Sequence, residues 1–160
     1  MNRTLRNLLF GGRSTGSLVG DAGTAILRLV AGLSMSLTHG LGKLYQDGQI
    51  GLPEQLVGGV EKMGFPAPTF FAWSAALAEF LGAFFVALGL FTRPAAFFAA
   101  STMAVAAFVV HAQDEFATKE MAVLYLAIFV MFMLKGSGRF SIDSLLRGDA
   151  KAAKGFDPVR

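Results

Sequence analysis

The chain has 160 residues, of which 54% are hydrophobic and only 16% are charged, whereas soluble domains carry about 25% charged residues. This balance argues against a disordered chain, a nucleic-acid-binding module and an ordinary soluble enzyme. The formal net charge is +3, but the basic residues gather toward the chain ends, which is typical of the flanks of membrane spans. Since there is no cysteine, the chain alone supplies no disulfide, thiolate chemistry or cysteine-bound metal cluster.

Four apolar segments are long enough, or nearly so, to cross a bilayer as helices, which takes about 20 residues. They cover residues 22–44, 69–91, 94–111 and 119–135. Four such helices leave too little polar sequence to cover them in water. The sequence therefore predicts an all-α membrane protein, a four-transmembrane-helix antiparallel bundle over residues 22–143. An N-terminal tail (residues 1–21) and a basic C-terminal tail (residues 144–160) flank this single domain.

The connections carry further signals. The lysine and arginine residues favour cytoplasmic positions for both termini. Residues 45–68 form the longest connection, and its apolar spacing predicts a short amphipathic helix that begins near Pro53 and ends near Gly64. We expect this helix to lie on the outer membrane interface and to cap the bundle; a plain linker is the alternative. After the fourth span, Ser141 is positioned to cap a short helix.

Polar side chains inside the spans are the candidate functional residues, because a charge there costs at least about 2.5–3.5 kcal/mol on insertion scales. Helical spacing places one polar or small stripe on the first span, formed by Arg28, Gly32, Ser36, His39 and Lys43. Glu79 lies among small residues of the second span, which predicts that it faces protein. His111 closes the third span, and Glu120 and Tyr125 belong to the fourth.

These residues predict a wet cavity in the outer half of the bundle. His39 and Glu79 are the expected catalytic pair, meeting directly or through one water to exchange protons and bind a ligand. The expected lining residues are Arg28, Ser36, Lys43, His111, Glu120 and Tyr125, with Arg28 holding Glu79 or closing the cavity below. The alternatives are structural. Lys43 and Glu120 would then mark the interface, Tyr125 would belong to an aromatic belt, Arg28 would reach headgroups, and His39 and Glu79 would only fix helix register.

A quinone suits this chemistry, since histidine and tyrosine donate hydrogen bonds to its carbonyls and glutamate relays protons. His39 and His111 are the available ligands for a b-type haem, but no supporting motif surrounds them, so this reading is disfavoured. No metal site is predicted, because the ligand set is sparse.

Four stretches of the sequence carry a resemblance to a known family. They are RLVAGLSMSLTHGLGKL, AEFLGAFFVALGLFTRPAA, KEMAVLYLAIF and GSGRFSID, at residues 28–44, 78–96, 119–129 and 136–143. In their order and spacing they resemble the DoxX family of small bacterial membrane proteins. The resemblance implies a four-helix membrane bundle, in agreement with the reading of the spans.

The resemblance also implies a role in a redox system. Members of the family include a subunit of thiosulfate:quinone oxidoreductase, and others associate with oxidative-stress enzymes. The expected function is therefore an inner-membrane subunit or anchor of such a system, in the bacterial cytoplasmic membrane. If enzymatic, it would be an oxidoreductase subunit that acts with a partner. Expected partners are the bilayer, a soluble redox enzyme, other subunits or a second copy, and no nucleic acid. A small-molecule or proton transport or binding protein and a non-catalytic membrane anchor stay open as alternatives.

Overall fold

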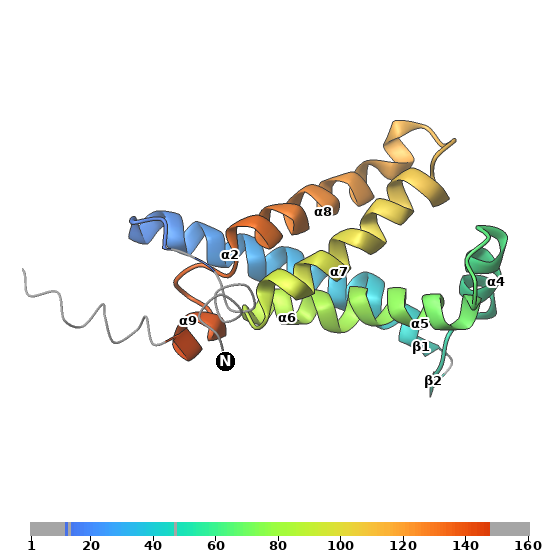
Figure 1. The fold of residues 1–160 in the computed structure, drawn as a ribbon, viewed down its shortest axis with the longest axis horizontal. Coiled ribbons are helices and arrows are strands. Elements are labelled where there is room, and N and C mark those ends of the chain that lie inside the picture. The colour runs from blue at the N-terminus through green and yellow to red at the C-terminus, as the bar shows by residue number, and fades with distance from the viewer. Residues whose placement is uncertain (1–11, 13, 47, 148–160) are drawn as a thin grey trace, which may run out of the picture.

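Four long helices dominate the computed structural model, which describes residues 12, 14–46 and 48–147 (Figure 1). Each is long and apolar enough to cross a membrane: Leu18–Leu44, Pro68–Leu88, Thr92–Val110 and Phe116–Lys135, called spans 1 to 4 below. The predicted all-α, four-span architecture is therefore confirmed. Most of the two predicted tails lies outside the described residues.

Span 1 is one continuous helix made of α2 (Leu18–Ser34), the π-helical segment η1 (Met35–Gly40) and α3 (Leu41–Leu44). It begins four residues before the predicted start, because Ser17 caps it by accepting a hydrogen bond from the backbone N–H of Gly20. Asp21 therefore belongs to the first turn of this helix.

The long connection folds into two elements. A small antiparallel hairpin pairs β1 (Tyr45–Gln46) with β2 (Gln49–Ile50); the sequence analysis did not anticipate it. The predicted short helix follows as α4 (Glu54–Lys62), and Val60 is its buried residue. An apolar side chain buried on a helix with charged termini fits the predicted amphipathic character.

Span 2 consists of α5 (Pro68–Leu77), the π-helical segment η2 (Ala78–Gly82) and α6 (Ala83–Leu88). It ends three residues before the predicted boundary, because Gly89 adopts a left-handed conformation with φ of 69°. Span 3 follows at once as α7 (Thr92–Val105) and the π-helical segment η3 (Ala106–Val110). The predicted spans left residues 92 and 93 as the connection, whereas the structure has it at residues 89–91, and Pro94 lies in the first turn of α7.

Span 4 is the single helix α8 (Phe116–Lys135), which starts three residues before the predicted boundary. After a turn comes α9 (Ile142–Arg147). Ser141 caps α9 as predicted, since its hydroxyl accepts a 3.1 Å hydrogen bond from the backbone N–H of Ser144.

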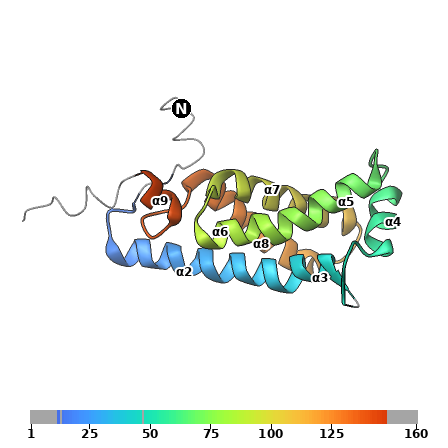
Figure 2. The same cartoon turned by 90° about the horizontal axis from the view of Figure 1, so that it is seen from below.

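The spans pack mainly as neighbouring pairs: α7 on α8, α2 on α6 and η1 on η2. Figures 1 and 2 show α9 at one end of the bundle and α4 at the other, and these ends are called the α9 end and the α4 end below. Toward the α4 end, the α7–α8 hairpin leans away from spans 1 and 2 (Figure 1). The apolar core lies between the spans, and half of its buried residues are alanine; the other half are Met35, Val86, Met103, Phe129 and Phe132. Small residues at such contacts let membrane helices approach closely.

Candidate functional site

A charged pair lies between spans 1 and 2. The ammonium group of Lys43 donates to both carboxylate oxygens of Glu79, at 2.6 and 2.7 Å. The Glu79 side chain is only 4% exposed, whereas that of Lys43 is 34% exposed. Lysine near the end of a membrane helix usually extends toward the headgroups, but here it turns inward to pair with the buried carboxylate. Lys43, which was expected only to line a cavity, is therefore the direct partner of Glu79.

The pair is positioned by two π-helical segments that touch each other. Glu79 belongs to η2. The segment η1, which ends three residues before Lys43 in the sequence, packs against η2. The backbones approach very closely at Gly40, where a Cβ atom would lie 2.5 Å from Cα of Phe80. Single-turn π-helical segments within α-helices are frequent at functional sites. Here two of them bring a lysine and a glutamate from different spans together.

The ring of His39, on the same side of span 1 as Lys43, contacts the ring of Tyr125 in span 4. His39 lies one helical turn before Lys43, and its ring meets Tyr125 of span 4 edge-on with centroids 6.0 Å apart. Tyr125 in turn stacks on Phe129 of the core, also at 6.0 Å. The His39 residue is exposed and Tyr125 is half-buried. Within the described part of the chain, Glu79 has its hydrogen bonds with Lys43 and none with His39.

Ser36 is completely buried one turn before His39 and Gly40. Its hydroxyl has no hydrogen-bond partner among the described residues. Other hydroxyls in the spans, such as those of Thr38, Ser74 and Ser101, donate to the carbonyl four residues earlier. A buried hydroxyl without a partner is costly unless water or a ligand satisfies it. Ser36 therefore stays a candidate site residue.

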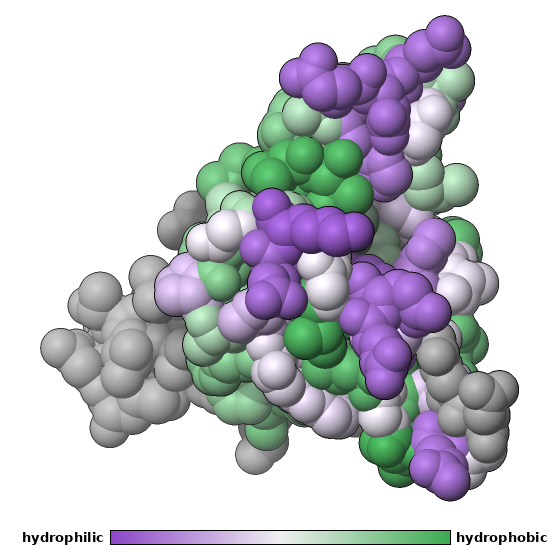
Figure 3. All heavy atoms as spheres, turned by 90° about the vertical axis from the view of Figure 1, so that its right-hand side faces the viewer, coloured by the Kyte–Doolittle hydropathy of each residue, from purple (hydrophilic) through white to green (hydrophobic). Residues whose placement is uncertain are grey.

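The residues predicted for the outer ends of spans 3 and 4 lie at the α4 end of the molecule, in and beside the loop that joins η3 to α8. His111 pairs through Nδ1 with the carboxylate of Asp114 at 2.7 Å; His111 is half-buried and Asp114 is exposed. Glu120 is also exposed. Figure 3 shows the α4 end with hydrophilic side chains gathered in several groups over it. The fold thus pairs His111 with its own loop, whereas Lys43 and Glu79 pair with each other.

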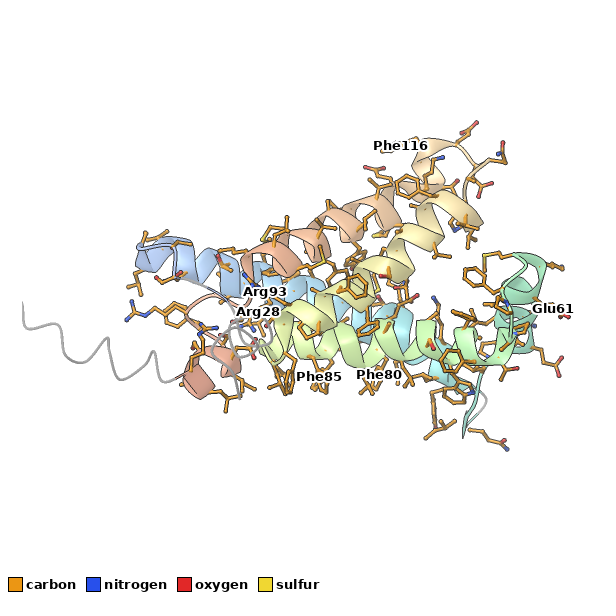
Figure 4. The ribbon with its side chains drawn as sticks, viewed as in Figure 1. Arg28, Glu61, Phe80, Phe85, Arg93 and Phe116 are labelled. Atoms are coloured by element: carbon orange, nitrogen blue, oxygen red, sulfur yellow. The ribbon has the colours of Figure 1, made fainter. Side chains whose placement is uncertain are left out.

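Arg28 lies away from Glu79, contrary to the expectation that it would hold this carboxylate. Its guanidinium donates to the carbonyl oxygens of Val86 at 3.3 Å and Phe140 at 2.6 Å. Val86 is seven residues beyond Glu79, about 10 Å along the helix. Figure 4 shows Arg28 toward the α9 end. Arg28 is almost fully buried, so it does not reach headgroups either.

A polar cluster around the turn between spans 2 and 3 explains the position of Arg28. Asp143 of α9 accepts hydrogen bonds from the backbone N–H groups of Phe91 and Thr92, at 2.8 and 3.0 Å, and from the Thr92 hydroxyl at 2.8 Å. It also interacts electrostatically with Arg28. Asp143 thus caps α7 from outside that helix, while Arg28 complements the carbonyl end of α6. This cluster joins spans 1, 2 and 3 to α9.

Sequence reasoning did not assign this cluster a structural role. Its members stood in the stretches that carry the family resemblance, but only Arg28 was interpreted, and as a cavity residue. One signal was available: glycine ends a helix at Gly89, and Thr92 opens the next. The capping carboxylate comes from a residue about 50 positions later, and no local pattern predicts that. Of the described residues, no group of three or more His, Asp or Glu side chains is arranged to hold a metal.

Comparison with known proteins places the chain in a family. The family model DoxX matches residues 23–112, which is more than half of the chain. This chain belongs to the DoxX family. A second family model, the TQO small subunit DoxD, matches residues 70–155 of this DoxX protein. An uncharacterized protein of Haemophilus influenzae is 32% identical over 127 residues, which cover 75% of this chain and 87% of that protein. No solved structure matches the chain.

Proposed function

We propose that this DoxX protein is a membrane subunit or anchor of a quinone-linked redox system, acting with a partner. This proposal rests on the ion pair between Lys43 and the buried Glu79, together with the contact between the His39 and Tyr125 rings, His39 being one helical turn before Lys43. Ionisable residues inside membrane spans are functional candidates by default, because their burial is costly. The match to the TQO small subunit DoxD supports the redox assignment.

The residues present fit a quinone headgroup. A quinone offers two carbonyl acceptors on a flat ring, and it arrives from the hydrocarbon region of the bilayer. His39 and Tyr125 carry hydrogen-bonding groups that have no partner within the described part of the chain, and the Phe129 ring behind Tyr125 is apolar. Imidazole and phenol would hold the carbonyls, and the aromatic rings would pack against the headgroup. When bound, a quinone supplies two-electron, two-proton redox chemistry.

The charged pair would supply the proton chemistry. Both carboxylate oxygens of Glu79 accept hydrogen bonds from the ammonium group of Lys43. Lys43 is the partly exposed member of the pair, so it is the group that connects the buried carboxylate to water. His39, one turn away, is the expected proton-exchanging group next to the ligand. In this proposal a partner would deliver the electrons; this chain has no cysteine with which to bind an iron–sulfur cluster of its own.

The test is quinone recovery from purified protein. The protein is incubated in lipid nanodiscs with a short-chain ubiquinone, separated from free quinone, extracted, and analysed by mass spectrometry. We expect His39→Ala and Tyr125→Phe each to lower the bound quinone several-fold, because each removes one hydrogen bond to it. Ser74→Ala is the matched control, since this exposed hydroxyl of α5 donates to the carbonyl of Phe70 in its own helix. Equal recovery from the parent, both variants and the control would exclude this site.

A parent protein that binds no quinone in nanodiscs would favour the anchor or transport alternatives. Proton or substrate flux by the purified protein in liposomes would then identify a transporter. A soluble enzyme recovered in stoichiometric amounts, with His39→Ala having no effect on its activity, would identify a simple anchor.

We also propose that both termini face the cytoplasm of a bacterial cell, with the α4 end outside. The chain has no native cysteine, so a single introduced cysteine reports its own position. Gln113→Cys lies in the exposed loop between η3 and α8, and we expect a membrane-impermeant maleimide to label it in intact spheroplasts. Labelling only after lysis would reverse the orientation.

A further inference from the structure

The short helix α9 is amphipathic, but its polar face is turned toward the protein and its apolar face outward, the reverse of a surface helix on a soluble protein. At about 100° per residue, Asp143, Ser144 and Arg147 share one face, and Ile142, Leu145 and Leu146 share the opposite face. The polar face is turned inward, where Asp143 and Ser144 are buried. The apolar face is turned outward, and Leu145 and Leu146 are 65% and 60% exposed.

The inward polar face is fully explained by hydrogen bonds. Asp143 binds the turn between spans 2 and 3 through both carboxylate oxygens, and its backbone N–H donates to the carbonyl of Gly89 at 2.8 Å. The Ser144 hydroxyl donates to the carbonyl of Ser141 at 2.7 Å. The bonds of Asp143 to this turn fix the rotation of α9 about its axis, so the leucines cannot turn inward without breaking them. Because this orientation is fixed, Leu145 and Leu146 stay on the outside of the protein. Exposed together, they need an apolar environment to cover them.

The apolar surface continues onto neighbouring elements of the α9 end. Phe140, just before α9, is 46% exposed, and Leu18 and Val19 at the start of span 1 are also exposed. Arg139 lies over the Phe140 ring at 6.0 Å and interacts electrostatically with Asp21 of span 1. The start of span 1 and the segment before α9 are therefore at the same level of the bundle. A lipid layer that contacts the start of span 1 therefore also contacts the segment before α9.

The exposed charge at this end is basic. Arg139 is exposed, and Arg93 and Lys135 lie nearby at half-buried positions. The two acidic residues described at this end, Asp21 and Asp143, are both buried. At the α4 end the described chain has five exposed acidic residues instead, Glu54, Glu61, Asp114, Glu115 and Glu120. An apolar face beside exposed arginine is the combination that binds anionic membrane surfaces.

We infer that α9 is an interfacial helix whose leucines insert among the acyl chains, while Arg139 binds the phosphate of an anionic phospholipid. The site consists of Arg139, Phe140, Leu145 and Leu146. It lies at the opposite end from the Lys43–Glu79 pair, so it does not depend on the function proposed for that pair. Its role is to hold the α9 end, with its polar cluster, at the level of the headgroups.

Tryptophan fluorescence tests this site. The single tryptophan, Trp73 of α5, is changed to Phe, and Leu146→Trp places a reporter on the outward face of α9; Leu145→Trp is the second reporter. Each variant is reconstituted in nanodiscs of phosphatidylcholine that contain a small fraction of brominated lipid, either phosphatidylglycerol or phosphatidylcholine. Bromine on the acyl chains quenches tryptophan only at contact distance, and acrylamide quenches it from water.

We expect brominated lipid to quench both reporters and acrylamide to have little effect. At equal mole fraction, brominated phosphatidylglycerol should be enriched about fivefold over phosphatidylcholine around the reporter, the fold-change that one arginine near a membrane surface provides. Arg139→Gln should abolish this preference, while both brominated lipids should still quench the reporters. Trp73 in the parent protein is the control, and we expect it to show no preference for the anionic lipid.

Three results would overturn the inference. Quenching by acrylamide but not by brominated lipid would place α9 in water. Blue-shifted emission that neither agent quenches would show that protein, such as a second copy, covers the leucines. Equal quenching by both lipids, unchanged by Arg139→Gln, would show that the site does not prefer anionic lipid.

Discussion

Gly89 leaves open the space that the guanidinium group of Arg28 occupies. A Cβ atom at Gly89 would lie 1.7 Å from Nη1 of Arg28 and 2.5 Å from Cβ of Ser141. The φ angle of Gly89 is 69°, a conformation that costs other residues about 1–2 kcal/mol. Glycine at this position therefore allows span 2 to end in a left-handed turn. It also leaves room for the Arg28 side chain of span 1 and for Ser141 at the start of α9.

Gly89→Ala should destabilise the protein strongly, because both the backbone conformation and the contact with Arg28 oppose a methyl group. We expect a loss well above 2 kcal/mol, larger than the conformational cost alone. Thermal unfolding of the detergent-solubilised protein, followed by size-exclusion chromatography, measures it. Gly23→Ala is the control, since a Cβ atom at Gly23 meets nothing within 4 Å, and we expect it to be neutral or mildly stabilising. Equal unfolding temperatures for the two variants would contradict the packing described here.

Asp143→Ala should also destabilise the protein, by about 2–4 kcal/mol, because three hydrogen-bond donors at the start of α7 lose their acceptor. Thr92→Val removes only one of these bonds and should cost about 1 kcal/mol. In a double-mutant cycle, Thr92→Val should cost clearly less when Asp143 is already alanine, because its partner is gone. Additive losses would show that the hydroxyl and the carboxylate do not interact.

The Lys43–Glu79 pair should respond unequally to the loss of each partner. Lys43→Met leaves the buried carboxylate of Glu79 without a partner, and breaking such a pair costs about 3–5 kcal/mol. Glu79→Gln leaves Lys43, which is partly exposed and long enough to extend toward the interface. We therefore expect Lys43→Met to unfold at a lower temperature than Glu79→Gln. The double variant should recover much of the loss, because no unpaired buried charge remains. The reverse order of the single variants would contradict the burial of Glu79.

Gly40→Ala should disturb the pair without changing either charge. A Cβ atom at Gly40 would lie 2.5 Å from backbone atoms of Phe80, so η1 would have to move away from η2. We expect a lower unfolding temperature and, under the proposed function, weaker quinone recovery than in the parent. Gly58→Ala in α4 is the control, because nothing lies within 4 Å of its Cβ position. Unchanged stability and recovery in Gly40→Ala would show that the close contact is not required.

The sequence predicted the architecture well, and the reason is physical. A membrane span needs a long apolar run, and this requirement is local, so the four helices and α4 could be placed from the sequence. The boundaries were less accurate at residues 89–92. There the end of span 2 and the start of span 3 depend on Asp143, which is distant in the sequence.

The sequence predicted only some of the residues that the structure brings together, since Arg28 and His111 have partners elsewhere. Glu79 was expected to be buried and to face protein, and it does. Its partner was expected to be His39 or Arg28, and it is Lys43. Helical spacing gave the shared stripe of span 1, but it did not say which member of the stripe lies level with Glu79. That level depends on the two π-helical segments, which have no clear sequence signature.

Two features were thus determined by the sequence itself: four apolar helices, and a set of polar residues that must face protein because lipid would not tolerate them. The tertiary structure decided how those polar residues are divided. Arg28 is drawn to Asp143 and the carbonyl end of α6 at the α9 end, while Lys43 pairs with Glu79 toward the α4 end. Each buried charge needs a partner within a few ångströms, and only the packing of the spans brings that partner into reach.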